Sequence, residues 1–343
     1  MPRSPCHSDG TRLLKIQDVA RHAGVSAATV SRVLNGRATV NPELAARVHA
    51  AVVELGYRPN GVARNLRRRQ TTLWAVLVSD VGNPFFTSLV RGVEDGGRQF
   101  GYSVVLCNTD ENRAREAEYI AVALADNMAG IIISPADDAT DISALVAAGT
   151  AVVTIDRELA DTDVDAVLVD NEKGAEQATT HLLDSGYRRI ACITGPRRMS
   201  TAMERLRGYQ RALKSFGVPQ DRALIRHADF REDGGYSAMA SLLDEGVDFD
   251  AVFVANNLMT VGAVECLTER EVTVPDQVGV IGFDDIPWAR LFRPSLSYVS
   301  QPTYELGRAA AQLLADRIDN PNRPTTRMVL QTELHPREST RRK

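Results

Sequence analysis

Apolar residues near the start of the chain recur three and four positions apart, which is the spacing of one face of an α-helix. Three such stretches follow one another. Their apolar positions are Ile16, Val19, Ala20 and Ala23 in the first, Val30, Val33 and Leu34 in the second, and Leu44, Val48, Val52 and Leu55 in the third. This pattern predicts three short helices around one small core.

Residues that begin and end helices separate these stretches. Gly24 supplies a turn with an expected positive φ, and Ser26 is a good N-cap for the second helix. Asn41-Pro42-Glu43 begins the third helix, and Gly56 ends it. Residues 15–36 therefore form two short helices joined by a glycine turn, the unit that places a helix in the major groove of DNA.

Beyond Thr72 short β-branched runs alternate with stretches of helical spacing. The runs include 73–79, 103–107, 130–134, 151–155, 189–193, 251–254 and 279–283, and the helical stretches include 113–127, 173–185, 204–216, 235–245 and 258–269. This alternation is typical of parallel sheets with right-handed crossovers. About a dozen strands exceed one doubly wound sheet, so we expect two α/β lobes, with ligands at the carboxyl ends of strands.

Charge separates the two parts of the chain more sharply than the net value of −4 suggests. Residues 1–72 carry twelve basic and four acidic residues, whereas the remainder carries 28 basic and 40 acidic residues. A basic head on an acidic body indicates that the head meets a polyanion and the body does not. The length of 343 residues suits two or three domains.

Cysteine usage and hydropathy predict a cytoplasmic protein. The four cysteines, Cys6, Cys107, Cys192 and Cys266, form no Cys-x-x-Cys pair, so scattered thiols in a reducing compartment are expected. No apolar run reaches the length of about 18 residues that a transmembrane helix needs, and the start of the chain lacks the apolar core of a signal peptide. We expect no membrane partner.

Catalysis is not expected. The histidines show no metal-ligand spacing, and no glycine-rich phosphate loop or nucleophile elbow is present, so we expect neither a metal nor a cofactor. The adjacent pairs Asp284-Asp285 and Asp137-Asp138 suit no general acid–base role, because neighbouring side chains in extended chain point apart.

The exposed face of the second helix carries candidate DNA contacts. Small residues at its start, Ala27 and Ala28, let the backbone approach base edges, Thr29 and Ser31 can donate to phosphates, and Arg32 can reach a guanine edge or a phosphate. The alternative is a solvated face on an ordinary three-helix bundle.

The basic segment 60–69 has two interpretations. It has too few apolar residues to form a stable helix alone, but it could fold against DNA phosphates, with Leu66 as a wedge between base steps in the minor groove. The alternative is a flexible basic linker.

Polar and aromatic residues follow successive strands of the body. Carboxylate, amide and guanidinium groups together can bind vicinal hydroxyls, and aromatic rings can pack on the C–H faces of a sugar. Each residue could instead be a core, cap or turn residue, but their recurrence favours a pocket. They are Asn83, Phe85, Phe86, Asp156, Arg157, Arg205, Phe230, Asn256, Asp284 and Gln301.

The head carries a specific resemblance. Residues 25–36, Val-Ser-Ala-Ala-Thr-Val-Ser-Arg-Val-Leu-Asn-Gly, and residues 57–66, Tyr-Arg-Pro-Asn-Gly-Val-Ala-Arg-Asn-Leu, closely resemble the LacI/GalR family of bacterial transcription repressors. The resemblance implies a second helix that reads the major groove and a hinge helix, after Pro59, that folds on operator DNA. The implied DNA-binding residues are Gln17, Ser26, Ala27, Ala28, Thr29, Ser31, Arg32, Asn35, Tyr57, Asn60, Ala63, Arg64 and Leu66. Lys15 and Gln17 depart from the family pattern, which usually has a capping threonine and a lysine there.

The body resembles the two-lobed, periplasmic-binding-protein-like fold of the same family, most closely its ribose-binding type. That resemblance implies that Ser134 and the ten strand-end residues contact a sugar effector. Ser134 stands where the ribose pattern has an asparagine, and Asn257 stands beside Asn256 where an aspartate is usual. A shorter serine could leave space for another sugar, so D-ribose is the first choice while another pentose, a hexose or a nucleoside stays open.

The expected fold is an all-α helix-turn-helix head with a hinge helix, joined to an α/β domain of two doubly wound parallel sheets. Its parts are a tail at 1–14, the DNA-binding domain at 15–58, the hinge and linker at 59–71, the effector-binding and dimerisation domain at 72–337, and a tail at 338–343. Within the effector domain, lobe 1 takes about 72–169 and 302–320, and lobe 2 about 170–299 and 325–337.

The expected function is that of a homodimeric repressor of sugar-catabolism genes, which binds a palindromic operator and is released by the sugar. Two alternatives stay open: a regulator for which the ligand is a corepressor, and a sugar-binding transport protein. The basic head argues against transport.

Overall fold

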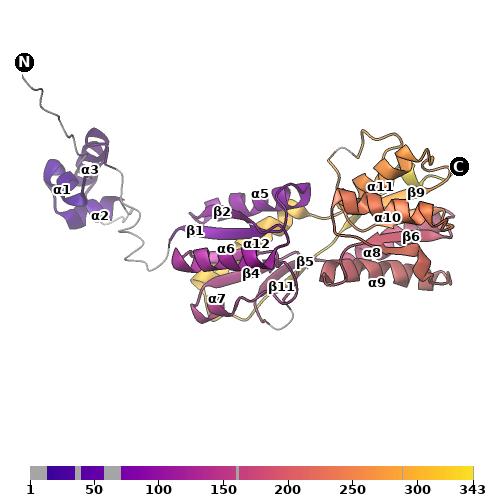
Figure 1. The fold of residues 1–343 in the computed structure, drawn as a ribbon. Helices are drawn as coiled ribbons and strands as arrows, with labels where there is room; N and C mark the ends of the chain where they lie inside the picture. The colour runs from indigo at the N-terminus through magenta and orange to yellow at the C-terminus, as the bar shows by residue number, and fades with distance from the viewer. Residues whose placement is uncertain (1–13, 35–39, 58–70, 160–161, 288, 343) are drawn as a thin grey trace, which may run out of the picture. The chain divides into compact units, whose positions relative to one another are not determined.

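The computed structural model describes residues 14–34, 40–57, 71–159, 162–287 and 289–342. The chain divides into two compact units, Met1–Arg69 and Gln70–Lys343, called here the head and the body, and each is described by itself (Figure 1). None of the described helices combines the length and the apolar character needed to span a lipid bilayer.

The head contains the three predicted helices, α1 (Ile16–Ala23), α2 (Ala27–Leu34) and α3 (Pro42–Glu54). Val19, Val30 and Val48, one from each helix, are fully buried and form the centre of its core. The predicted apolar stripes therefore face one another, and this packing stabilises helices that are too short to persist alone.

The turns and caps of the head follow the sequence prediction. Gly24 has a φ of 63°, and Ser26 accepts a hydrogen bond from the backbone N–H of Thr29 at 3.1 Å. At the start of α1, where Lys15 replaces a capping threonine, the Asp18 carboxylate accepts the backbone N–H of Lys15 at 2.9 Å. Asp18 thus satisfies a backbone donor at this helix start.

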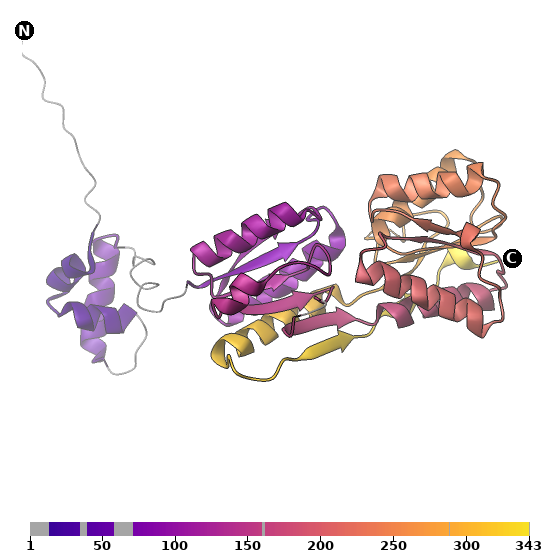
Figure 2. The ribbon, with the colours of Figure 1, turned by 60° about the horizontal axis from the view of Figure 1, so that its bottom comes forward.

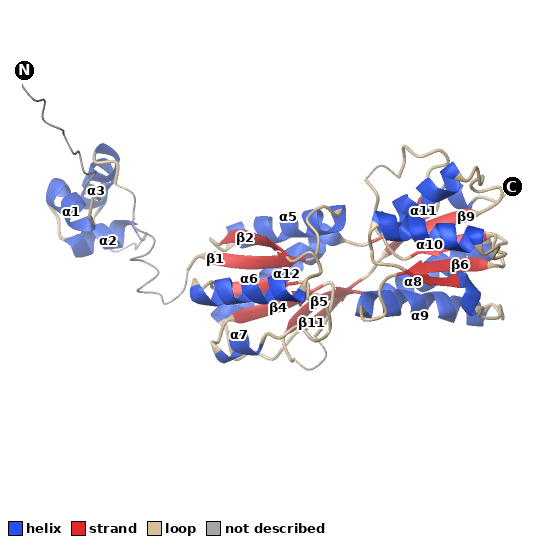
Figure 3. Ribbon diagram, in the orientation of Figure 1, coloured by secondary structure: helices blue, strands red, loops and turns tan. Residues whose placement is uncertain are grey.

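The body contains two sheets of six strands each among its described residues (Figure 3). The first has the order β11-β5-β4-β3-β1-β2 and the second the order β12-β10-β9-β8-β6-β7. The strands are β1 (Leu73–Val78), β2 (Ser103–Asn108), β3 (Gly130–Ile133), β4 (Ala151–Ile155), β5 (Asp165–Val169), β6 (Ile190–Thr194), β7 (Ile225–His227), β8 (Ala251–Val254), β9 (Gly279–Phe283), β10 (Ser297–Ser300), β11 (Arg327–Leu330) and β12 (Glu333–His335). The predicted strands agree with these within one residue at each end.

Helices cover the sheets. The first lobe has α5 (Pro84–Gln99), α6 (Arg113–Ala125), α7 (Ser143–Ala147) and α12 (Thr303–Asp319), and the second has α8 (Asn171–Asp184), α9 (Ser200–Ser215), α10 (Glu232–Asp244) and α11 (Asn257–Glu269), with short 3-10 turns at Arg222–Leu224 and Glu338–Thr340. Helix α9 begins four residues before its predicted start. Helices α5, α7 and α12 lie outside the stretches assigned from periodicity.

Side chains alternate along the inner strand β1, so the first sheet has a core on each face. Figure 2 shows the ribbon of this lobe, with helices covering the sheet. Trp74 and Val76 pack in the cluster that includes residues of α5 and α12. Ala75 and Leu77 join a second cluster with residues of α6 and α7. Burial on both faces explains why these strands read as continuous apolar runs.

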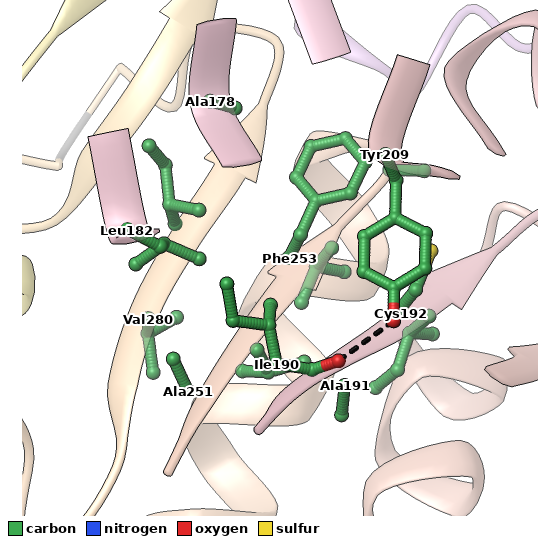
Figure 4. Close-up of a cluster of buried hydrophobic side chains, with 14 of the residues drawn as sticks. Ala178, Leu182, Ile190, Ala191, Cys192, Tyr209, Ala251, Phe253 and Val280 are labelled. Atoms are coloured by element: carbon green, nitrogen blue, oxygen red, sulfur yellow. Dashed lines mark hydrogen bonds between the residues drawn. The ribbon is translucent and has the colours of Figure 1, made fainter. Parts of the chain in front are cut away.

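The second lobe has a large core of its own, part of which Figure 4 shows. Leu182 of α8, Phe253 of β8 and Tyr209 of α9 are buried there, and the Tyr209 hydroxyl donates to the Ile190 carbonyl at 2.7 Å. Each lobe therefore packs independently and can move as a unit.

The chain passes between the two lobes at three places: from β5 to α8, from β10 to α12, and from β11 to β12. This topology corrects two expectations. Strand β11, expected in lobe 2, pairs with β5 in the first sheet, and β12 runs antiparallel to β10, so the second sheet is not wholly parallel.

Residues 338–340, expected in a tail, are packed as well. Ser339 and Thr340 are buried, and the Ser339 hydroxyl donates to the Val280 carbonyl at 2.6 Å. Thr340 lies at hydrogen-bond distance, 2.8 Å, from both His181 and Ser297. These contacts fasten the last residues to the second lobe, a pairing that the local sequence does not indicate.

Candidate functional site

A cleft in the body is lined mainly by residues that follow the carboxyl ends of strands in both sheets. It encloses about 520 Å³ of space, including space open to solvent. Its lining residues are Asp80, Asn83, Phe85, Phe86, Glu111, Asp156, Arg157, Thr201, Arg205, Asp229, Phe230, Arg231, Asn256, Asp284 and Gln301. Strand ends of α/β sheets are the usual place for ligands, because the loops there diverge and leave an opening.

Ten of the eleven residues assigned to the pocket from the sequence line this cleft. Ser134 is the exception: it is fully buried, and its hydroxyl donates to Asp156 Oδ2 at 3.4 Å. Sequence reasoning missed Asp80, Glu111, Thr201, Asp229 and Arg231. The expectation that ligands lie at the carboxyl ends of strands could have indicated Asp80, Glu111 and Asp229, because they stand two or three residues beyond β1, β2 and β7.

Arg157 is held rigidly in the first lobe. Its two terminal nitrogens donate to the two carboxylate oxygens of Glu111 at 2.9 and 2.8 Å, and one also donates to the Pro135 carbonyl at 2.9 Å. This two-pronged pairing fixes the plane of the guanidinium group, because Arg and carboxylate geometries match. Glu111 is therefore a positioning residue for Arg157.

Arg205 has the corresponding place in the second lobe. Its Nε donates to Asn171 at 2.8 Å, and its guanidinium carbon lies 4.0 Å from the ring centre of Phe283. Arg205 Nη1 lies 3.6 Å from Asp284 Oδ2, and Gln301 Nε2 donates to the other oxygen of Asp284. The network orients a carboxylate, an amide and a guanidinium group toward one space.

Two buried polar atoms of these networks have no hydrogen-bond partner among the described residues. They are Arg157 Nε, which can only donate, and Gln301 Oε1, which can only accept. Arg157 Nε does lie 3.4 Å from Asp156 Oδ2, as an ion pair without a hydrogen bond. A buried polar atom without a partner costs about 1–3 kcal/mol, so its presence in a cleft is a reason to expect a ligand or water there. A ligand with hydroxyl groups can serve both atoms, since a hydroxyl donates and accepts.

Burial raises the pKa of Asp156 and of Asp284. Arg157 and Arg205 oppose this effect at Asp156, and Arg205 and Gln301 oppose it at Asp284. A ligand that donates hydroxyl hydrogens to these carboxylates would offset the cost of burying their charge.

Four lining residues have backbone angles in the left-handed region: Glu111 at φ 55°, Asp156 at φ 68°, Phe230 at φ 65° and Asp284 at φ 73°. Such angles cost about 1–3 kcal/mol for residues other than glycine, and they persist where surrounding structure imposes them. Because they lie together at one cleft, these backbone conformations orient the side chains of the lining loops toward it.

Aromatic side chains form the apolar walls. Asn83 caps α5 by accepting the N–H of Phe85 at 3.0 Å, and the rings of Phe85 and Phe86 meet edge to face at 4.9 Å. The ring of Phe230 lies against Gly195, where an added Cβ would come within 2.2 Å of the ring. Gly195 is therefore required for Phe230 to reach its place in the cleft wall.

The two lobes contact each other beside the cleft. Asn257 donates to Asn83 at 2.9 Å, and Arg231 of the second lobe pairs with Asp110 of the first at 2.6 Å. Asn256 caps α11 and donates to the Phe230 carbonyl at 3.0 Å. Asn257, which departs from the ribose pattern, thus contributes a contact between lobes.

In the head, the residues assigned to DNA contact have different environments. Gln17, Ser26, Ala28 and Arg32 are exposed, and Ala27, Thr29 and Ser31 are half-buried. Tyr57 is only 8 % exposed, and its ring packs in the core of the head. Asn35, Asn60, Ala63, Arg64 and Leu66 lie outside the described residues.

Comparison with known proteins shows which family this chain resembles. The profile for bacterial regulatory proteins of the lacI family matches residues 15–60, and the profile for a periplasmic binding protein-like domain matches residues 179–340. The chain is 36 % identical over 317 residues to the ribose operon repressor of Escherichia coli (strain K12), which covers 92 % of this chain and 96 % of that protein.

Two solved structures are similar over nearly the whole chain. The lac repressor dimer bound to operator and the anti-inducer ONPF has a TM-score of 0.86 at 27 % identity, covering 96 % of this chain and 99 % of that one. A complex of the transcriptional regulator CelR with cellobiose has a TM-score of 0.74 at 35 % identity, covering 95 % and 99 %. On this evidence the chain belongs to the lacI family of bacterial regulatory proteins, as a DNA-binding transcriptional regulator and not an enzyme.

Proposed function

We propose that this protein is a homodimeric repressor of sugar-catabolism genes that binds a palindromic operator and is released when a sugar enters the cleft of its body. The observation that carries the proposal is the pair of buried atoms that lack a hydrogen-bond partner, Arg157 Nε and Gln301 Oε1, inside a cleft walled by carboxylates and aromatic rings. A sugar supplies donors, acceptors and apolar C–H faces together.

Each lining group has a role in this proposal. Asp156 and Asp284 accept hydroxyl hydrogens from the sugar, and Arg157 donates to a hydroxyl or ring oxygen. Phe85, Phe86 and Phe230 pack on the faces of the ring. Asn83, Arg205, Asn256 and Gln301 complete the polar contacts, and Ser134 acts through Asp156.

D-ribose is the first choice of effector. The similarity to ribose operon repressors supports it, whereas the similarity to a regulator solved with cellobiose keeps a larger sugar as an outcome of the test. Another pentose, a hexose or a nucleoside is the next candidate, because Ser134, which departs from the ribose pattern, contacts the lining residue Asp156.

Helix α2 is the proposed reading element of the head. Ala28 and Arg32 lie exposed on it, and Ala27 stands at its first turn. Residues 60–66 are proposed to fold on the operator, with Leu66 entering the minor groove. A homodimer presents two such helices to two half-sites, so protein symmetry matches the operator.

Sugar binding is proposed to control the head through the relative position of the lobes. The three chain passages between lobes allow rotation, and a bound sugar contacts both lobes at once. A ligand that prefers one arrangement by about 1–3 kcal/mol changes operator occupancy about 5–150-fold.

The test is a titration of the operator-bound protein with D-ribose, other pentoses, hexoses, cellobiose and nucleosides, read by fluorescence anisotropy of the DNA. We expect release by one small sugar. Arg205→Ala should abolish the response and leave operator binding intact. Arg211→Ala is the matched control, because Arg211 lies on the same helix α9 but is 60 % exposed. Failure of every sugar to act, or a sugar that tightens operator binding, would contradict release by sugar.

A further inference from the structure

All three arginines that line the cleft are already paired with carboxylates of the protein. Arg157 is bonded to both oxygens of Glu111, Arg205 lies 3.6 Å from Asp284, and Arg231 lies 2.6 Å from Asp110. The remaining hydrogen bonds of Arg205 go to the Asn171 side chain and the Ala255 carbonyl. An incoming anion would therefore have to replace a carboxylate that already holds its cation.

The cleft also carries carboxylates in excess. Asp80 and Asp229 line it, and the hydrogen bonds that these two side chains accept come from backbone N–H groups, of Gly82 and of Arg231, at 2.8 and 3.0 Å. Together with Glu111, Asp156 and Asp284 they make five carboxyl groups among the lining residues, against three guanidinium groups. Carboxyl groups therefore outnumber guanidinium groups among the lining residues.

Arg231 is the one lining arginine with substantial exposure, 49 % of its side chain, so it is the group that could turn toward an anion. Its surroundings oppose that movement. Asp110, Asp80 and Asp229 all raise its pKa, which places three carboxylates within electrostatic range of one cation. Turning Arg231 away would leave those carboxylates facing the anion, and like charges repel at short range.

From this arrangement we infer that the cleft selects an uncharged sugar and rejects the phosphate monoester of the same sugar, with Asp80 and Asp229 as the residues that enforce the selection. The inference rests on the proposed function, since it concerns the sugar site itself. Recognition of phosphate normally uses unpaired arginine forks or exposed backbone N–H groups, and placing like charges together across an interface costs several kcal/mol. The excess carboxylates thus act as a specificity device through repulsion.

The experiment compares D-ribose with D-ribose 5-phosphate on the full-length protein, by isothermal titration calorimetry at matched ionic strength. We expect the phosphate ester to bind at least about 100-fold more weakly, the scale that like-charge repulsion implies. Where another sugar of the panel binds instead, that sugar and its own terminal phosphate ester form the pair.

The charge-removing variants Asp80→Asn and Asp229→Asn keep an oxygen that can accept the backbone N–H, so the turns are retained. Each should reduce the ratio between the two dissociation constants by about fivefold to tenfold, the scale of one screened charge pair at about 4 Å. Asp248→Asn is the control, because Asp248 is 83 % exposed and does not line the cleft, and it should leave the ratio unchanged.

The outcomes separate the two proposals. If a phosphate ester binds as tightly as its parent sugar, the inference is wrong and the sugar function stands. If the ester is rejected but neither variant changes the ratio, charge repulsion is not the cause and the inference is again wrong. If no sugar of either kind binds, the proposed function fails and the inference fails with it.

Discussion

The ion pair between Asp110 and Arg231 leads to a prediction about lobe closure, because it joins the two lobes beside the cleft at 2.6 Å. Asp110 and its neighbour Glu111 both have positive φ, at 56° and 55°, so one strained turn holds Arg157 on one side and Arg231 on the other. Replacing either member of the pair with alanine should make the closed arrangement less stable and weaken sugar binding.

The magnitude follows from exposure. The side chains are 49 % and 40 % exposed, and ion pairs of this kind contribute about 0.2–1 kcal/mol. That range corresponds to a change of about 1.4-fold to fivefold in the dissociation constant of the sugar. The effect should shrink at high salt, since exposed charges are screened.

The assay is a double-mutant cycle on sugar affinity with Asp110→Ala, Arg231→Ala and the double variant, measured by calorimetry at low and high salt. The cycle isolates the pair from other roles of Arg231 as a lining residue. Arg115 supplies the matched control, because it contacts Asp110 at 3.4 Å within the same lobe and should show no coupling in sugar affinity. A coupling of zero for Asp110 and Arg231, or one equal to that of Arg115, would refute the reasoning.

Three further predictions concern stability. Asp165 is fully buried and accepts hydrogen bonds from Arg317 and Arg323 at 2.7–3.0 Å. Asp165→Ala should lower the free energy of unfolding, measured in urea, by about 3 kcal/mol, because it leaves two arginines without their buried partner. A loss below about 1 kcal/mol would show that this ion-pair network does not stabilise the fold. Gly92→Ala would place a Cβ 2.1 Å from the Tyr304 carbonyl oxygen, where α5 packs on α12. We expect the free energy of unfolding in urea to fall by about 1–3 kcal/mol. Unchanged stability would contradict the close packing of these two helices. Burial lowers the pKa of His181 from 6.5, so below about pH 6.5 the unfolded chain binds more protons than the folded protein, and stability decreases as the pH is lowered. His181→Gln should therefore reduce the dependence of the melting temperature on pH between about pH 7.5 and 5.5. An unchanged dependence would contradict this assignment.

Local signals in the sequence were sufficient for much of the fold. The period of apolar residues gave the helices of the head, and Gly24, Ser26 and Asn41 marked their ends, because caps and turns depend on residues within one helical turn. The strand-end rule brought ten candidate residues to one cleft, since parallel strands end at the same edge of a sheet.

Other features depend on contacts between residues far apart in the chain. Tyr57, an expected DNA contact, packs in the core of the head, and residues 338–340, expected in a tail, pack against Val280 and His181. Local periodicity carries no information about such partners.

The sequence by itself determined the class of the molecule: a basic helical head on an α/β body, and the kinds of polar and aromatic groups that follow its strands. Only the tertiary structure decided how those groups are paired. It placed β11 in the first sheet, held Arg157 on Glu111, and joined Asp110 to Arg231 across the lobes. The physical reason is that residue type and spacing fix local backbone preference, whereas partners and charge balance in a cleft depend on which distant loops the packed sheets bring together.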